Sequence, residues 1–196
     1  MIKKGEWFLI LFNLLYIIPF TIYYININNF EFLGYIAILV AIFLFIAGTL
    51  RKTRFDYFIL WGLSIWGLLH MAGGGVRFNG NVLYALELIP IWVTENFFIL
   101  KYDQFVHFYL YVIVAIAVFY LLRRQLKNGA NYKFIYLVSA LSSVGIGGLN
   151  EIAEFIMVLT LANTGVGGYY NTAWDLVFNT GGAILGVVIA HFKYRR

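Results

Sequence analysis

Six long apolar runs constrain the fold of this 196-residue chain more than any other feature. Each approaches the roughly 20 residues that an α-helix needs to cross a bilayer core about 30 Å thick. The apolar residues are continuous rather than alternating, which is typical of membrane helices and not of membrane barrels. The expected spans are residues 7–26, 30–50, 57–74, 103–122, 133–161 and 172–192. The sequence therefore predicts an all-α, polytopic bundle of six transmembrane helices, forming a single integral membrane domain over residues 1–196.

The composition agrees with this class. The chain is 62% hydrophobic and only 12% charged, whereas soluble domains carry about 25% charged residues. This excludes an ordinary soluble domain, a disordered chain and a basic nucleic-acid-binding domain, so membrane lipids rather than nucleic acid are the expected partners. There is no cysteine, which excludes disulfides, thiolate nucleophiles and cysteine metal sites. The oligomeric state does not follow from the sequence.

The basic residues predict the orientation. All Lys and Arg except Arg77 and Lys101 lie before the first span, after the sixth, or in the connections after the second and fourth spans. These residues are Lys3, Lys4, Arg51, Lys52, Arg54, Arg123, Arg124, Lys127, Lys133, Lys193, Arg195 and Arg196. The positive-inside rule then places both termini in the cytoplasm. The expected location of the protein is the inner (cytoplasmic) membrane of the cell. We interpret the first run as a retained span, because it is long for a signal peptide and no small-residue cleavage site follows it.

The longest connection, residues 76–102, is predicted on the outer side and is unusual for a loop. It contains an apolar stretch, residues 82–93, interrupted by Glu87 and Pro90. We expect this segment to lie in the membrane interface or to re-enter the bilayer as a lid. An interfacial amphipathic helix without a chemical role is the alternative.

Polar residues within the spans are the main indication of function. A charged residue such as Asp at the centre of a spanning helix costs about 2.5–3.5 kcal/mol on insertion scales, so such groups are rare without a role. Here they come late in the third and fifth spans, which run outward, and early in the fourth and sixth, which run inward. The candidate site residues are His70, Asp103, His107, Asn150, Glu151, Glu154, Asp175 and Asn179. All are therefore expected at one depth, in the outer half of the bilayer.

The spacing of these residues supports convergence. Three pairs are four residues apart and therefore share a helix face: Asp103 with His107, Asn150 with Glu154, and Asp175 with Asn179. Gly182 and Gly186 continue the last stripe, and Gly145 and Gly148 lie just below the acidic pair of the fifth span. Small residues allow close helix approach, so we expect tightly packed helices below a compact polar pocket.

Several chemistries fit such a pocket. Histidines and carboxylates suit a divalent ion such as Zn, Mn or Fe, for which His70, His107, Glu154 and Asp175 are the candidate ligands. The same eight groups could instead perform acid–base catalysis without a metal. They could also form a proton or ion relay in a transporter or flippase-like permease, or only lock the helices together in a non-catalytic protein.

The inner halves of the spans are apolar apart from Asn13 and scattered Ser or Thr, which disfavours a continuous polar path for transport. The leading hypothesis is therefore a membrane-embedded enzyme, metal-dependent or acid–base, that acts on a lipid-like or envelope substrate.

The order of these motifs resembles that of the YjdF-like family of predicted inner-membrane proteins over roughly residues 57–190. The matching elements are His70-Met-Ala-Gly-Gly, Leu83-Tyr84, Ile89-Pro90, Tyr102-Asp103-x-x-x-His107, Glu154 and Trp174-Asp175. Gln104 departs from the pattern, because YjdF-like sequences often carry Arg there. The resemblance implies a compact helical membrane protein with an outward-facing polar site.

The VanZ-like family is a more distant likeness. Its members carry an Asp-x-x-x-His at the start of a span, an acidic residue in the next, and then Asp-x-x-x-Asn-x-x-Gly. Here the corresponding residues are Asp103 and His107, Glu151 or Glu154, and Asp175, Asn179 and Gly182. VanZ-like proteins are associated with resistance to the glycopeptide teicoplanin, so this likeness implies a connection with the cell envelope and its lipids.

Overall fold

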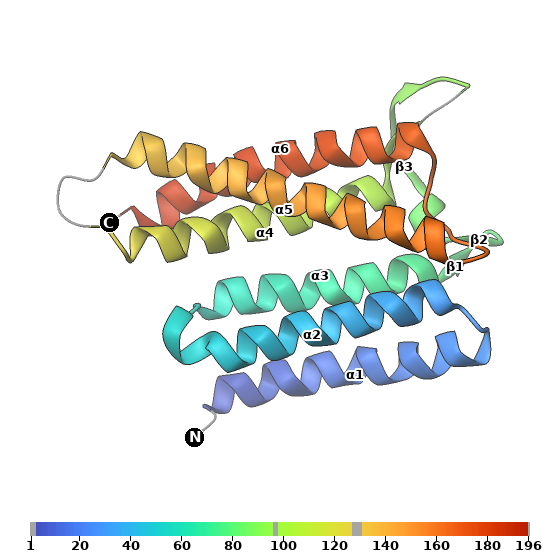
Figure 1. Ribbon diagram of the computed structural model, residues 1–196, viewed down its shortest axis with the longest axis horizontal. Coiled ribbons are helices and arrows are strands. Elements are labelled where there is room, and N and C mark those ends of the chain that lie inside the picture. The colour runs from blue at the N-terminus through green and yellow to red at the C-terminus, as the bar shows by residue number, and fades with distance from the viewer. Residues whose placement is uncertain (1–2, 96–97, 127–130, 196) are drawn as a thin grey trace. The chain divides into compact units, whose positions relative to one another are not determined.

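A computed structural model describes residues 3–95, 98–126 and 131–195 of the chain. Within these residues there are six long α-helices, each long and apolar enough to cross a membrane. They are α1 (Lys4–Asn26), α2 (Phe30–Thr53), α3 (Tyr57–Gly75), α4 (Tyr102–Arg123), α5 (Tyr132–Thr160) and α6 (Tyr169–Tyr194), shown in Figure 1. The predicted six-helix class is confirmed, and every helix boundary lies within three residues of its predicted position.

Local capping explains several helix boundaries. The side chain of Asn29 accepts a hydrogen bond from the Phe32 amide at 3.0 Å at the start of α2. Asp56 accepts one from the Ile59 amide at 3.1 Å at the start of α3. Asn and Asp are favoured at this position because their side chains satisfy amides that have no partner within the helix.

The described residues separate into two compact units, and the prediction of a single domain over residues 1–196 stays a prediction. The first unit contains the residues up to Leu86 together with Met157–Gly165. The second contains Glu87–Ile156 and the residues from Val166 onward. The chain therefore passes between the units after Leu86, near the end of α5 and in the loop that follows α5.

In the first unit, α1, α2 and α3 lie side by side (Figure 1). The buried Tyr24 hydroxyl of α1 donates to the Met71 carbonyl of α3 at 2.6 Å. The loop after α5 is attached to this unit because Glu31, at the start of α2, accepts the Gly165 amide hydrogen at 2.6 Å. Hydrogen bonds between segments distant in sequence thus fix the packing of this unit.

In the second unit, α4 packs closely against α6 because two glycines of α6 face the α4 backbone. A Cβ atom built at Gly182 or Gly186 would overlap the backbone carbonyl oxygen of Phe108 or Val112. The prediction of close packing is confirmed for this stripe. On α5, however, a Cβ at Gly145 or Gly148 meets no described atom within 4 Å.

Short strands and one 3-10 turn lie among the described residues between α3 and α4. The elements are β1 (Arg77–Phe78), β2 (Asn81–Val82), the 3-10 helix η1 (Leu83–Ala85), β3 (Glu87–Val93) and β4 (Phe98–Lys101). The alternative of an amphipathic helix is therefore wrong, since β3 pairs antiparallel with β4. Branched residues favour strands, and Pro90 is tolerated because a two-stranded sheet has only edge strands.

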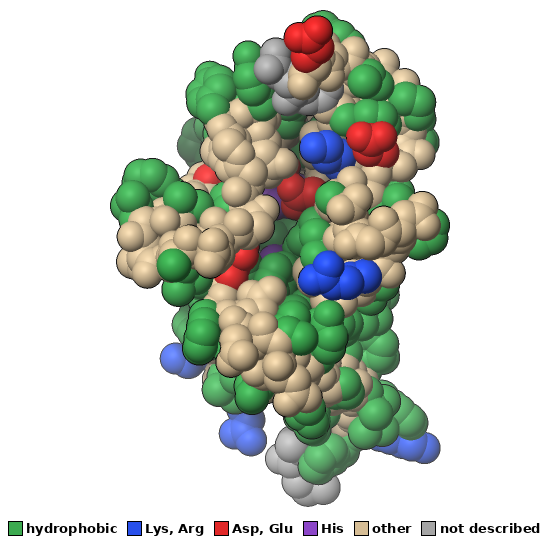
Figure 2. Space-filling model, turned by 90° about the vertical axis from the view of Figure 1, so that its right-hand side faces the viewer, with side chains coloured by type: hydrophobic (Ala, Val, Ile, Leu, Met, Phe, Trp, Pro, Cys, Tyr) green, Lys and Arg blue, Asp and Glu red, His purple; other side chains and the backbone are tan. Residues whose placement is uncertain are grey.

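Large apolar side chains remain exposed along the helices. Leu15 of α1 is 66% exposed, and Leu44 and Phe45 of α2 are 67% and 72% exposed. Figure 2 looks onto the end of the molecule on the right of Figure 1, where hydrophobic side chains cover much of the surface and Lys, Arg, Asp and Glu side chains lie among them. An apolar surface of this kind suits contact with lipid chains. Of the residues used to predict orientation, Lys127 and Arg196 lie outside the described residues.

Candidate functional site

The first part of the site is the opening of α4. Asp103 and His107 lie one turn apart, and Asp103 Oδ1 is 3.7 Å from His107 Nε2. Between them, Gln104 turns away: its Oε1 accepts the Lys101 amide at 3.0 Å and its Nε2 donates to the Phe98 carbonyl at 3.3 Å. Gln104 therefore fixes the turn from β4 into α4 and leaves the site to Asp103 and His107.

The second part comes from α5, which presents two carboxylates to the same imidazole. Glu151 Oε1 is 3.6 Å from His107 Nδ1, and Glu154 Oε1 is 3.8 Å from His107 Nε2. Asn150 donates to Glu154 Oε1 at 2.9 Å across one helical turn, as its spacing predicts. His107 thus has acidic neighbours on both ring nitrogens.

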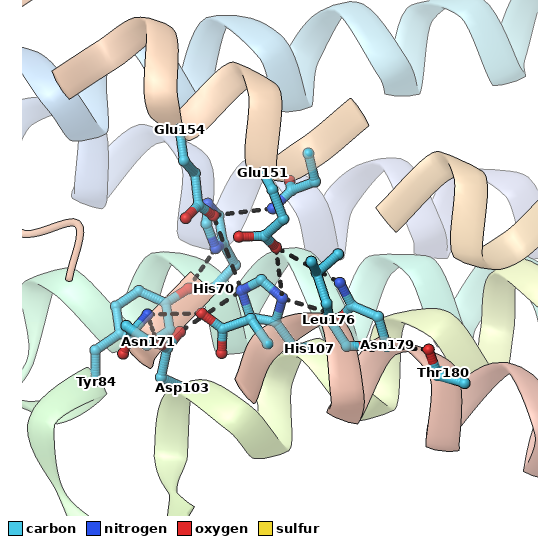
Figure 3. Close-up of polar contacts among 12 residues, drawn as sticks. His70, Tyr84, Asp103, His107, Glu151, Glu154, Asn171, Leu176, Asn179 and Thr180 are labelled. Carbon is cyan, nitrogen blue, oxygen red and sulfur yellow. Dashed lines mark hydrogen bonds and ion pairs between the residues drawn. The ribbon is translucent and has the colours of Figure 1, made fainter. Parts of the chain in front are cut away.

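The third part comes from α6, where Asn171, Asp175 and Asn179 follow one another at four-residue intervals (Figure 3). Asn171 Nδ2 donates to Asp175 Oδ2 at 2.6 Å and to Asp103 Oδ2 at 3.1 Å. It therefore connects the carboxylates of two helices.

Asn179 fixes the protonation pattern of His107. Its Oδ1 is 3.1 Å from His107 Nδ1, and its Nδ2 donates to Glu151 Oε1 at 3.5 Å. An amide oxygen carries no hydrogen, so the Nδ1–H of the imidazole must be the donor. In the neutral ring, Nε2 then presents its lone pair toward Asp103 and Glu154.

Two carboxylate oxygens in this cluster are buried without a partner. Among the described residues, neither Glu151 Oε2 nor Asp175 Oδ1 accepts a hydrogen bond. Asp175 is fully buried, and Glu151 is 7% exposed. A buried acceptor without a partner is costly, so these atoms indicate a site built for a cation, a water or a substrate group.

The donor set has the spacing of a metal centre. Two groups of side chains place one ligand atom each within 4.8 Å of one another: His107 with Asp103 and Asp175, and His107 with Glu151 and Glu154. The separations of 3.7 and 3.8 Å from His107 Nε2 to Asp103 and Glu154 exceed the usual N–H···O range of about 2.7–3.2 Å. Two ligands at about 2.1 Å from one tetrahedral ion stand about 3.4 Å apart, so these gaps fit shared coordination better than hydrogen bonding.

His70 has different surroundings in the first unit. The Tyr84 hydroxyl hydrogen-bonds to its Nδ1. Its ring stacks on Trp66 with centroids 5.5 Å apart and meets Tyr35 edge-on at 5.2 Å. All predicted site residues other than His70 belong to the second unit and meet around His107, whereas neither metal-competent group includes His70.

Asn171 is a site residue that the sequence reasoning missed. The predicted sixth span began at residue 172, whereas α6 begins at Tyr169, so Asn171 was assigned to the preceding loop. The signal was present, because Asn171 extends the four-residue series of Asp175 and Asn179 by one turn. It also borders a cavity of about 230 Å³, whose other lining residues include Lys101, Tyr170 and Trp174.

Fold and site together define the class of this molecule: a polytopic α-helical membrane protein with a buried histidine–carboxylate cluster. Residues 8–196 match the family of predicted membrane proteins called DUF2238, and the chain belongs to this family. This agrees with the resemblance to YjdF-like proteins, whereas the likeness to VanZ-like proteins stays a prediction. Searches of the curated proteins and of the solved structures found no match.

Proposed function

We propose that this protein is a membrane-embedded, metal-dependent enzyme that acts on a lipid-like or envelope substrate from the outer half of the inner membrane. Both termini lie in the cytoplasm in this proposal. The observation that carries it is the meeting of His107 with four carboxylates, two of which keep buried oxygens without a hydrogen-bond partner.

The proposed ligands are His107 Nε2 and the Oδ1 atoms of Asp103 and Asp175. Asn171 occupies the Oδ2 atom of each aspartate, which leaves the two Oδ1 atoms for coordination. Asp103 Oδ1 is 3.7 Å from Nε2, and Asp175 Oδ1 is the buried atom without a partner. This set keeps His107 and Asp175 from the four ligands predicted by sequence, adds Asp103, and leaves out His70 and Glu154.

Two asparagines form hydrogen bonds with these ligands and orient them. A metal-binding histidine usually donates its other ring N–H to an oxygen that fixes the tautomer, and Asn179 Oδ1 is that acceptor here. Asn171 holds the two aspartates together in the same way. One imidazole with two carboxylates suits Mn²⁺ or Fe²⁺, and also Zn²⁺.

The glutamates of α5 have a separate role in this proposal. Glu151 Oε1 and Glu154 Oε1 already accept hydrogen bonds from Asn179 and Asn150. Glu151 Oε2 has no partner among the described residues, so it is the acceptor available to take a proton from an attacking water. A divalent ion would supply the charge that activates this water and polarises an ester or phosphoester group.

The same geometry disfavours a proton or ion relay. In the described part of the second unit, the buried non-aromatic polar side chains outside the cluster are Gln104, Ser139 and Ser143. Gln104 bonds to backbone atoms at the start of α4. The serine hydroxyls donate to the carbonyls of Ile135 and Tyr111 at 2.7 and 3.1 Å. None of the three side chains extends a polar path from the cluster along the helices.

The test uses the purified protein in nanodiscs made from envelope lipid extract, loaded with Mn²⁺. Mass spectrometry of the lipids should reveal a product that forms with the wild-type protein and disappears after chelation. Glu151→Gln should retain the metal and lose the product, because Gln cannot accept the proton. An unchanged lipid profile with metal-loaded wild-type protein would contradict the enzymatic proposal.

A further inference from the structure

A second cavity, unrelated to the histidine–carboxylate cluster, lies in the first unit. It has a volume of about 760 Å³ and is formed where α1 begins, α2 ends and α3 begins. These three helix ends lie at the same end of the unit in Figure 1. Its charged lining residues are Lys3, Glu6, Arg51, Arg54 and Asp56.

The charge of this cavity is cationic in effect. Glu6 Oε2 accepts the Lys3 amide hydrogen at 2.7 Å, and Asp56 Oδ1 accepts the Ile59 amide hydrogen at 3.1 Å. Each of the two carboxylates therefore has one oxygen committed to a helix cap. Lys3, Arg51 and Arg54 contribute three positive charges against the two negative charges of Glu6 and Asp56, so the lining carries a formal net charge of +1 and favours an anion.

Arg54 leaves the end of α2 in an unusual backbone conformation. Arg54 ends α2 in the left-handed conformation with φ of 49°, and its amide donates to the Leu50 carbonyl at 2.8 Å. Gly or Asn usually occupies this position, because a side chain with a Cβ is disfavoured there. An arginine at this position holds a guanidinium, which suits phosphate oxygens, beside the cavity.

The rest of the cavity wall is largely apolar. Ala47, Leu50, Phe55 and Leu60 line it together with the cations. Leu44 and Phe45, which precede Ala47 in α2, are 67% and 72% exposed. A free phosphate ion gains nothing from such a wall, whereas a phospholipid can bring its phosphate to the arginines and its chains to the apolar side chains.

We propose that this cavity binds the phosphate headgroup of an anionic phospholipid. The site is independent of the metal-dependent activity proposed above, since it shares no residue with the cluster. With the predicted topology, the lipid belongs to the cytoplasmic leaflet, where basic pockets between membrane helices recognise anionic headgroups.

The test measures lipid binding to the full chain in detergent by native mass spectrometry. The ligands are dioleoyl phosphatidylglycerol, dioleoyl phosphatidylcholine and inorganic phosphate. The double variant Arg51→Gln/Arg54→Gln is compared with Arg123→Gln/Arg124→Gln, a basic pair near the end of α4 that does not line the cavity. Thermal melting of both variants checks that each remains folded, and the single variant Arg51→Gln serves if the double variant does not.

We expect phosphatidylglycerol to bind the wild-type protein and the Arg123/Arg124 variant with similar affinity. Binding to the Arg51/Arg54 variant should be at least tenfold weaker, since each basic residue near a charged membrane surface contributes about 1 kcal/mol. Equal weakening in the two double variants would overturn the proposal. So would equal affinity for phosphatidylcholine, or full displacement of the lipid by millimolar inorganic phosphate.

Discussion

Two histidines of this protein have opposite surroundings. His107 has carboxylate oxygens 3.6–3.8 Å from both ring nitrogens. Within the first unit, the ring of His70 stacks on Trp66, and its Nδ1 hydrogen-bonds to the Tyr84 hydroxyl. Both residues lie near the predicted outer ends of their spans and look equivalent in the sequence. The comparison indicates that the neighbours contributed by other helices decide which histidine is suited to bind a metal. The residue type and its depth in the span do not.

The largest expected effect is on metal binding by His107. His107→Ala should lower Mn²⁺ affinity by more than 100-fold, since loss of a ligand should exceed the 10–100-fold effect of losing an outer-shell partner. Isothermal titration of the purified protein in detergent measures this change. His70→Ala is the matched control and should retain metal at unchanged stoichiometry. Equal loss of metal in the two variants would remove the distinction between the histidines.

The next effect concerns the asparagine that orients His107. Asn179→Ala should weaken Mn²⁺ binding by about 10–100-fold, because Nδ1–H loses the acceptor that fixes its tautomer. Asn150→Ala, which removes the donor to Glu154 Oε1 and leaves the Nδ1–H acceptor in place, should weaken it less. The same titration separates the two variants. Unchanged affinity in Asn179→Ala would show that the imidazole is oriented by other contacts.

A smaller effect is expected from the glycines beneath the cluster. Gly182→Ala should lower the free energy of unfolding by about 1–3 kcal/mol, because the added methyl group overlaps the Phe108 carbonyl of α4. Gly148→Ala is the control, since its methyl group meets no described atom within 4 Å. There the better helix propensity of Ala should leave stability equal or higher by up to about 1 kcal/mol. Thermal melting compares both variants, and equal destabilisation would contradict the packing of α4 on α6.

The smallest effect should come from the ring of His70. His70→Phe keeps an aromatic side chain against Trp66 and Tyr35 and removes the hydrogen-bond partner of the Tyr84 hydroxyl. Loss of that hydrogen bond should cost about 1 kcal/mol of stability and leave Mn²⁺ binding unchanged. Melting and titration of this one variant test both parts, and a variant that melts normally but binds no metal would reverse the assignment.

Much of this arrangement could be predicted from the sequence because membrane helices have simple rules. Apolar length gives the spans, and four-residue spacing gives the shared faces of Asp103 with His107 and of Asp175 with Asn179. Neither rule says which helix contacts which. Tight packing is therefore predicted both at Gly182, where the structure has it, and at Gly148, where a Cβ meets no described atom within 4 Å. Asn171 was missed because the start of α6 depends on the backbone of the preceding loop rather than on apolarity.

The central claim is that one divalent ion binds at His107 and not at His70. Electron spin-echo spectroscopy of Mn²⁺ bound to protein carrying ¹⁵N-histidine tests it directly, because only a coordinated imidazole nitrogen couples strongly to the ion. We expect Mn²⁺ to couple to the imidazole nitrogen of a single histidine. This coupling should be absent in His107→Ala and unchanged in His70→Phe. Bound Mn²⁺ without histidine coupling, or a coupling that survives in His107→Ala, would contradict it.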